Sequence, residues 1–156
     1  MSDVLLVRVV NVIEKNEDNE KNMITSLKEG YIVSAKAVAY IINANPDAEK
    51  NVDELKKIAD LMSVDEIHLF DTTGKIYSGT IPEYYGYQWG YLKPMLEDKT
   101  LTMCQDVTPN TSEGKKMMYA ITWDETGTRM VQVGIEPVRL LNEVKQNEIS
   151  SIVENM

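Results

Sequence analysis

The sequence predicts an α+β protein in which helices flank an antiparallel sheet. Apolar residues recur every three or four positions over residues 22–43 and 137–154, as on one face of a helix. They alternate with period two over residues 64–80 and again over residues 116–135, as in strands. Because the strand-like segments follow one another between helical ones, the sheet is expected to be antiparallel rather than built from alternating parallel units.

The first element is a long helix over residues 4–43. Its apolar stripe continues upstream through Val10 and Ile13, but the acidic residues Glu17 and Glu20 interrupt it. At 1.5 Å per residue such a helix measures ~60 Å, which is more than one small domain can cover. We therefore expect its uncovered part to form a stalk or to pair with another helix. The stripe itself consists of Ile24, Leu27, Tyr31, Ala35, Val38 and Ile42.

A second, shorter helix is expected after the pair Asn45-Pro46, which ends the first one. Asn51, followed three residues later by Glu54, is close to a capping box and marks the new start. The amphipathic pattern of this helix ends near residue 62 and comprises Leu55, Ile58, Ala59 and Met62.

Five strands are predicted over residues 66–70, 75–79, 101–106, 116–124 and 128–135. A turn at Asp71–Gly74 joins the first two, with Asp at its first position and Gly at its last. A loop over residues 80–100, with a short helix near residues 91–96, leads to the third strand. Pro137 then begins an exit helix that runs to residue 154.

The strand over residues 116–124 indicates how the sheet is covered. Met117, Tyr119, Ile121 and Trp123 would occupy one of its faces, and Met118 and Ala120 the other. A strand that is apolar on both faces is central and covered on both sides. The long helix can cover one face and the loop over residues 80–100 the other, where a cavity can form.

Composition excludes several classes of function. With 156 residues the chain suits one domain, residues 1–156. Its net charge of -9 leaves no basic surface for nucleic acid. One cysteine excludes an internal disulfide, and one histidine argues against a zinc site, so we expect neither metal nor cofactor. The sequence contains no run of about 18 apolar residues, so no membrane span is expected in it.

The hairpin IHLFDTTGKIYSGT resembles the first two strands of the Cache family, including the F-D-x-x-G-K turn between them. Members of this family are extracytoplasmic sensor domains of bacterial membrane receptors and carry a PAS-like sheet. The preceding helix, the aromatic segment that follows, and the strand VQVGIEP before the exit helix are similar to that family in their order. The resemblance covers nearly the whole chain and implies the single-module form, with a central five-stranded antiparallel PAS-like sheet.

The resemblance also implies a role and a location. Such domains sit outside the membrane between two transmembrane helices and report ligand binding to a histidine kinase, a diguanylate cyclase or a chemoreceptor. This chain would then be the sensor part of a longer, membrane-anchored protein that forms a homodimer through the long helix. Family members often bind small carboxylates or amino acids through the loop and the central strands.

The densest aromatic cluster of the sequence lies in the loop and offers the first candidate ligand contacts. Its rings provide flat apolar walls with hydroxyl or indole donors, the mixture found in small-molecule pockets. The alternative is that some of these rings only hold the loop on the sheet. The cluster consists of Tyr84, Tyr85, Tyr87, Trp89 and Tyr91.

Further candidates lie on the predicted inner strands, namely Gln105, Tyr119 and Gln132. A polar side chain that faces the interior needs a hydrogen-bond partner, and a ligand can supply it. Trp123 is expected in the core. Three lysines could neutralise a carboxylate ligand, although lysine is usually a solvated surface group: Lys93, Lys115 and Lys116.

Three other residues or motifs have a functional interpretation beside a structural one. His68 could bind haem or sense pH, but on a strand we expect it to have an ordinary partner. Cys104 could be redox-active, yet a strand cysteine is usually a small buried hydrophobe. Asn110-Thr111-Ser112 matches a glycosylation acceptor and is interpreted as a loop.

Three functions therefore compete. In a sensor, a bound amino acid, amine or carboxylate would move the loop against the sheet and bias the terminal helices between two arrangements. A spacer would dimerise through the long helix and bind nothing, with the aromatic rings filling the pocket. An enzyme is the least favoured class, because the sequence offers no catalytic residues arranged as Ser/His/Asp or Cys/His, and no phosphate loop.

Overall fold

The computed structural model describes residues 2–109 and 114–154, and the side chains of residues 17–109 and 114–149. The predicted glycosylation motif Asn110-Thr111-Ser112 lies outside the described residues. Two compact units are present: residues 28–136, which contain the sheet, and residues 1–27 together with 137–156.

The long helix is α1 (Ser2–Ala44), which agrees with the predicted range within two residues. Within the sheet-containing unit its predicted stripe faces the core, where Ala35, Val38 and Ile42 are fully buried. The helix ends at Asn45, whose backbone N–H and side-chain amide both donate to the carbonyl of Ile41.

The second helix follows a short 3₁₀ turn, η1 (Pro46–Ala48), and is α2 (Val52–Met62). Asn51 caps it as predicted, because its side chain accepts a hydrogen bond from the backbone N–H of Glu54 at 3.2 Å. Ser63, at φ 56°, ends it in the left-handed conformation and turns the chain into the sheet.

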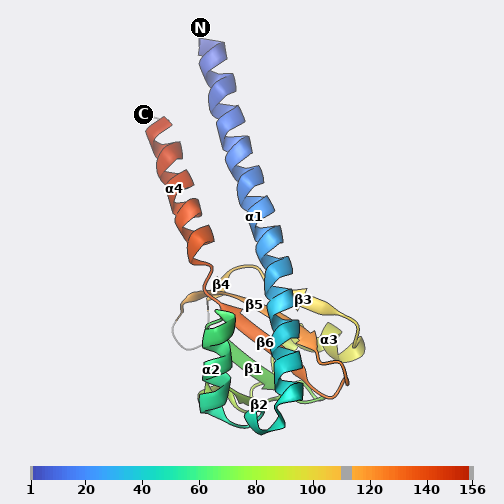
Figure 1. Ribbon diagram of the computed structural model, residues 1–156. Helices are drawn as coiled ribbons and strands as arrows, with labels where there is room; N and C mark the ends of the chain where they lie inside the picture. Colours follow the sequence, from blue (N-terminus) through green and yellow to red (C-terminus); the bar gives the residue numbers. More distant parts are fainter. Residues whose placement is uncertain (1, 110–113, 155–156) are drawn as a thin grey trace. The chain divides into compact units, whose positions relative to one another are not determined.

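The sheet is antiparallel throughout, in the order β2-β1-β6-β5-β3, with β4 paired to β5 (Figure 1). The predicted α+β class and all five predicted strands are confirmed, and β5 is an inner strand as expected. The sixth strand, β4, was not predicted, because it has only two residues and one of them is Pro109. The strands are β1 (Glu66–Phe70), β2 (Ile76–Gly79), β3 (Thr102–Cys104), β4 (Thr108–Pro109), β5 (Lys116–Trp123) and β6 (Met130–Ile135).

Each face of the sheet has its own apolar cluster. On the helical face, Ile67, Val133 and Ala120 pack with buried residues of α1 and α2, the two helices that lie against the sheet in Figure 1. On the opposite face, Ile121 and Trp123 pack against the segment over residues 80–100. That segment contains the short helices η2 (Pro82–Tyr84), η3 (Gly90–Leu92) and α3 (Lys93–Glu97).

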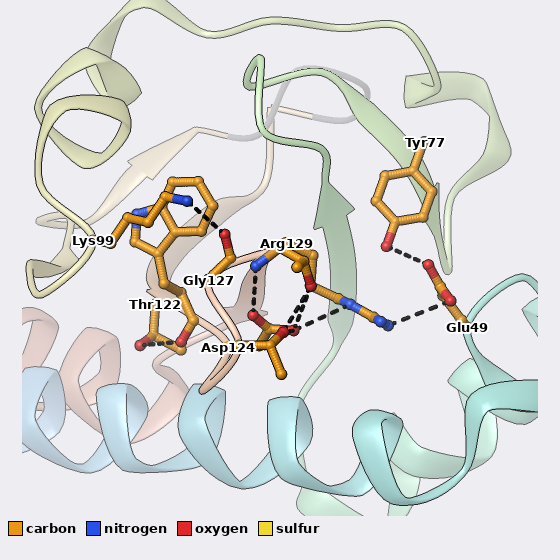
Figure 2. Close-up of polar contacts among 10 residues, drawn as sticks. Glu49, Tyr77, Lys99, Thr122, Asp124, Gly127 and Arg129 are labelled. Carbon is orange, nitrogen blue, oxygen red and sulfur yellow. Dashed lines mark hydrogen bonds and ion pairs between the residues drawn. The ribbon is translucent and has the colours of Figure 1, made fainter.

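A charged network fastens the end of the sheet to the α1–α2 connection (Figure 2). The Asp124 side chain is fully buried and lies 3.3 Å from Nε of Arg129. Arg129 reaches Glu49 with Nη1 at 3.5 Å, and Glu49 accepts a hydrogen bond from the Tyr77 hydroxyl at 2.7 Å. Burial, and then that bond to Glu49, raise the pKa of Tyr77 well above its ordinary value. The Lys99 ammonium lies 5.1 Å from the ring centre of Trp123 and donates to a turn carbonyl.

The exit helix is α4 (Val138–Glu154), beginning directly after Pro137 as predicted. In its own unit, Asn147 donates a hydrogen bond from Nδ2 to Glu20 at 2.7 Å, which links α4 to the first half of α1. Within the described residues, no helix combines the length and the hydropathy that crossing a bilayer requires.

Candidate functional site

A group of polar residues is buried on the loop-facing side of three adjacent strands. His68 on β1 lies directly opposite Gln132 on β6, and both side chains are fully buried. Glu66 on β1 and Tyr119 on β5 both lie opposite Gly134, which separates them on β6. Residues directly opposite one another share a face of the sheet, so these side chains all lie beneath the loop over residues 80–100.

Glycine at position 134 lets Tyr119 reach across β6. A Cβ atom at this position would lie 2.6 Å from Cε1 of Tyr119, so the aromatic ring occupies the space that any other side chain would need. The Tyr119 hydroxyl thereby donates to Oε2 of Glu66 at 3.1 Å. Nε2 of His68 lies 3.0 Å from Oε1 of the same carboxylate, so one acidic group joins two other strand residues.

Aromatic rings from the loop and the sheet surround the His68 imidazole. Ring centroids of Tyr84, Trp89 and Tyr119 lie 5.4, 6.2 and 6.4 Å from that of His68. Tyr91 stacks on Trp89 at 6.2 Å, and its hydroxyl accepts a hydrogen bond from Nε2 of Gln132 at 2.7 Å. We call this group the sheet–loop cluster; it consists of Glu66, His68, Tyr84, Trp89, Tyr91, Tyr119 and Gln132.

Two buried atoms of the sheet–loop cluster have no hydrogen-bond partner among the described residues: Nδ1 of His68 and Oε1 of Gln132. Buried polar atoms in proteins are paired in the great majority of cases, and an exception is explained by an ordered water, a bound ion or molecule, or a functional role. A carboxylate can only accept, so Nε2 of His68 supplies the hydrogen to Glu66. In the neutral imidazole, Nδ1 is then an unused acceptor.

Burial sets the protonation of three groups. Burial raises the pKa of Tyr119 far above its ordinary value, and the charge of Glu66 is the next largest cause of this rise. Burial also raises the pKa of Tyr91 to about 12, so both hydroxyls keep their protons at neutral pH. Burial raises the pKa of Cys104 to about 11, and this thiol packs against the apolar cluster of the helical face. Because the reactive form is the thiolate, Cys104 behaves as a hydrophobe, as expected.

The structure brings five predicted site residues into the sheet–loop cluster: Tyr84, Trp89, Tyr91, Tyr119 and Gln132. The other three lie at its margin. Tyr85 is 39% exposed and donates to the carbonyl of Gly79, and Tyr87 is 41% exposed and stacks on Tyr84. Gln105 follows β3 and is half-buried, and its backbone N–H donates to the Tyr119 carbonyl.

The three predicted lysines lie outside the sheet–loop cluster as it is defined above. Lys115 is paired with Glu136 at 2.8 Å, and Lys116 is exposed at the start of β5. Lys93 lines a hollow of about 250 Å³ between the β1–β2 turn and the loop, which it shares with Trp89 and Leu96. Trp123 lies in the core as expected, with its indole N–H donating to the Met95 carbonyl at 2.7 Å.

Glu66 and His68 were not selected as site residues from the sequence, although a signal for them existed. They alternate with Ile67 and Leu69, which fill the helical face. Because the sheet is covered on both sides, the residues that alternate with Ile67 and Leu69 must be buried as well. Two polar residues among them therefore indicate polar groups in the interior. Nε2 of His68 has an ordinary partner, Glu66, as expected. Nδ1 of His68 has no hydrogen-bond partner among the described residues.

Metal binding finds no support among the described side chains. They include no group of three or more His, Cys, Asp and Glu residues placed to hold an ion. The charged network around Asp124 is built from ion pairs and turn hydrogen bonds. The sheet–loop cluster offers one carboxylate, an imidazole, an amide and several aromatic rings.

Comparison with known proteins gives a match at the level of structure. No protein-family model and no curated protein matches the sequence. The V. cholerae histidine kinase DctB sensor domain is similar with a TM-score of 0.58 and 12% identity, over 90% of this chain and 59% of that one. The sensory domain of the Campylobacter jejuni chemoreceptor Tlp3 with isoleucine bound is similar with a TM-score of 0.56 and 12% identity, over 92% of this chain and 63% of that one.

A third similar structure is the Bacillus subtilis YkuI protein, which has an EAL domain, with a TM-score of 0.59 and 14% identity. The match covers 83% of this chain and 36% of YkuI, so the chain spans about a third of that protein and less than two thirds of the Tlp3 and DctB domains. These likenesses confirm the fold that the sequence resemblance implied: the chain has the fold of the Cache sensor domains.

Proposed function

We propose that this chain is the extracytoplasmic ligand-sensing domain of a membrane-anchored bacterial receptor, whose output is a histidine kinase, a diguanylate cyclase or a chemoreceptor. The observation that carries the proposal is the sheet–loop cluster, in which two buried polar atoms lack partners beneath a loop. A small molecule bound there would satisfy them. The similar Tlp3 domain has been solved with isoleucine and with L-valine bound, which supports a small-molecule partner.

A ligand at this position can move the loop. Hydrogen bonds join the first half of the loop to β2 and to the β1–β2 turn, so a movement of the loop would be passed to the sheet. Gly86 and Tyr87 exchange backbone hydrogen bonds with Ile76, and the Gln88 amide donates to the Thr73 carbonyl. A ligand can also act along β6. Gln132 lies three residues from the end of that strand, and α4 begins at Val138, so a small shift of β6 passes through the chain to the exit helix.

Ligand binding is expected to raise the melting temperature of the purified chain. The test is a thermal-shift panel of amino acids, amines, carboxylates and short sugars, each at millimolar concentration. A ligand at about 100 times its Kd adds about 2.7 kcal/mol to the free energy of unfolding. For a domain of this size, that stabilisation corresponds to a rise of roughly 5–10 °C.

The binding site is checked with a pair of matched variants. Tyr119→Phe removes only the hydroxyl that donates to Glu66 and is expected to reduce the shift, whereas Thr25→Val removes an exposed hydroxyl on α1 and is expected to leave it unchanged. A panel without any shift, together with no small molecule released on denaturation, would instead support the spacer.

We also propose that α1 pairs with the α1 helix of a second copy. Twelve positions of the helix repeat with alternating steps of four and three, and no charged residue occupies any of them. This period of 3.5 is that of a two-stranded coiled coil, and asparagines within such a seam fix its register. In the described part of the seam, Val33 and Tyr40 are each 65% exposed. The seam comprises Leu5, Val9, Val12, Asn16, Asn19, Met23, Ser26, Gly30, Val33, Ala37, Tyr40 and Ala44.

Val33→Glu is expected to weaken self-association by at least about tenfold, because like charges would meet across the seam. Sedimentation equilibrium measures the dimer Kd. Lys56→Glu introduces the same residue at an exposed position of α2 and is expected to leave the Kd within about twofold of the parent chain. A parent chain that is monomeric at 100 μM, or a Val33→Glu dimer as tight as the parent, would refute the pairing.

A further inference from the structure

We infer that the sheet–loop cluster selects a small primary amine, bound as its ammonium ion, rather than a carboxylate. This inference rests on the proposed function, since it names the ligand class of the same site. It follows from three properties of the cluster: the sign of its charge, its surplus of hydrogen-bond acceptors, and the rings around it.

With the His68 imidazole neutral, the formal charge of the cluster is negative. Glu66 is its only side chain with a fixed charge, and its side chain is 8% exposed, so the carboxylate is largely out of water. Lys115 directly precedes β5 and lies an even number of residues from Tyr119. Its ammonium is 2.8 Å from Oε2 of Glu136, whose charge balances it. A carboxylate ligand would therefore bring a second negative charge next to Glu66, whereas an ammonium would pair with it. Like charges in a poorly solvated site are unfavourable, and opposite charges are attracted.

Counting hydrogen bonds leads to the same class of ligand. The Glu66 carboxylate has two oxygens with about four acceptor sites, and the hydrogen bonds from His68 and Tyr119 use two of them. With the imidazole neutral, Nδ1 of His68 adds an unused acceptor, and Oε1 of Gln132 adds another. The unused donors are the Tyr91 hydroxyl hydrogen and the second hydrogen on Nε2 of Gln132, so unused acceptors outnumber unused donors. An ammonium group carries three donors and no acceptor, while a carboxylate carries only acceptors.

The rings add an attraction for a cation. Tyr84, Trp89 and Tyr119 all lie within 6.5 Å of the His68 ring, and the Tyr84–Trp89 pair is edge-to-face at 6.1 Å. Aromatic faces attract an ammonium through their quadrupole, and aromatic cages with a nearby carboxylate recognise such groups. The hydrocarbon tail of an amine can lie against the same rings.

Glu66 and Tyr119 are the least deeply buried strand residues of the cluster. These two residues are 6% and 7% exposed, whereas His68 and Gln132 are fully buried. The half-buried loop rings of Trp89 and Tyr91 are more exposed than either, and the partnerless atoms of His68 and Gln132 lie on fully buried side chains. The partly exposed Tyr87, which stacks on Tyr84, continues the aromatic surface toward solvent.

Three probes of nearly equal shape test the inference: 3-methylbutylamine, 3-methylbutanol and 3-methylbutanoate. Isothermal titration and thermal shift at pH 7 are expected to show the amine bound at least about tenfold more tightly than the alcohol, the difference that a charge-assisted hydrogen bond supplies. The carboxylate is expected to bind most weakly. Glu66→Gln keeps the shape of the side chain and is expected to remove the preference for the amine.

Two further variants separate charge from folding. Glu83→Gln makes the same change at an exposed position of the same loop and is expected to leave amine binding as in the parent chain. Tyr119→Phe keeps the Glu66 charge and is expected to retain the preference for the amine over the carboxylate at reduced affinity.

The inference is overturned if 3-methylbutanoate binds as well as the amine, if Glu66→Gln binds the amine unchanged, or if none of the three probes binds. These outcomes remain distinguishable from failure of the proposed function. If the probes fail but another compound of the thermal-shift panel binds and its shift is lost in Tyr119→Phe, the sensor role stands and only the ligand class is wrong. If nothing binds at all, both fail.

Discussion

Asp124→Ala is expected to lower the free energy of unfolding by about 3–5 kcal/mol, the usual cost of removing one partner from a buried ion pair. The Asp124 carboxylate is fully buried and lies 3.3 Å from Nε of Arg129 (Figure 2). It also accepts hydrogen bonds from the backbone N–H of Thr128 at 3.0 Å and from the hydroxyl of Thr126 at 3.0 Å. Alanine would therefore leave a largely buried guanidinium and an open turn between β5 and β6.

Urea denaturation and thermal melting measure this effect, and the expected fall in Tm is roughly 10 °C. Asp124→Asn keeps a side-chain oxygen for the turn and removes only the charge, so it is expected to cost less than alanine. The double variant Asp124→Ala with Arg129→Met removes both charges and should recover part of the loss. An Asp124→Ala chain within about 1 kcal/mol of the parent would show that the network contributes little to stability.

Periodicity predicted the order of the elements because each element here is long or strongly patterned. The stripe of α1, the alternation in β5 and the cap at Asn51 are local signals, and the structure confirms each one. The elements that differ are those without a pattern. β3 is shorter than the predicted strand over residues 101–106, and β4 is two residues long. Pairing with β5 creates both of them, and pairing between distant segments is not visible in a short sequence window.

The candidate site was only partly visible for a related reason. The aromatic residues of the loop stood out by composition, but which of them point inward depends on backbone turns such as the one at Gly86, where φ is 92°. Thus Tyr84 is buried while Tyr85 and Tyr87 are about 40% exposed. The bond from Tyr119 to Glu66 spans 53 residues and depends on strand order and on a glycine between them. No local pattern contains that information.

Gly134→Ala is expected to destabilise the chain by about 1–3 kcal/mol, the typical cost of overpacking an interior position. The new Cβ would lie 2.6 Å from Cε1 of Tyr119 and 3.3 Å from Cβ of Glu66. The tyrosine ring must then move away from β6, which breaks the hydrogen bond from its hydroxyl to Glu66. Ligand-induced shifts in Tm are expected to fall with it. Gly90→Ala is the matched control, because a Cβ at Gly90 meets no atom within 4 Å.

A double-mutant cycle with Tyr119→Ala shows whether the cost of Gly134→Ala arises from the ring. If it does, adding a methyl group at position 134 is expected to cost little once the ring is gone, which gives a coupling of about 1 kcal/mol or more between the two sites. Chemical denaturation of the four chains measures that coupling. Additive losses would mean that the methyl group disturbs the β5–β6 backbone instead, and that Tyr119 owes its position to the loop rather than to the glycine.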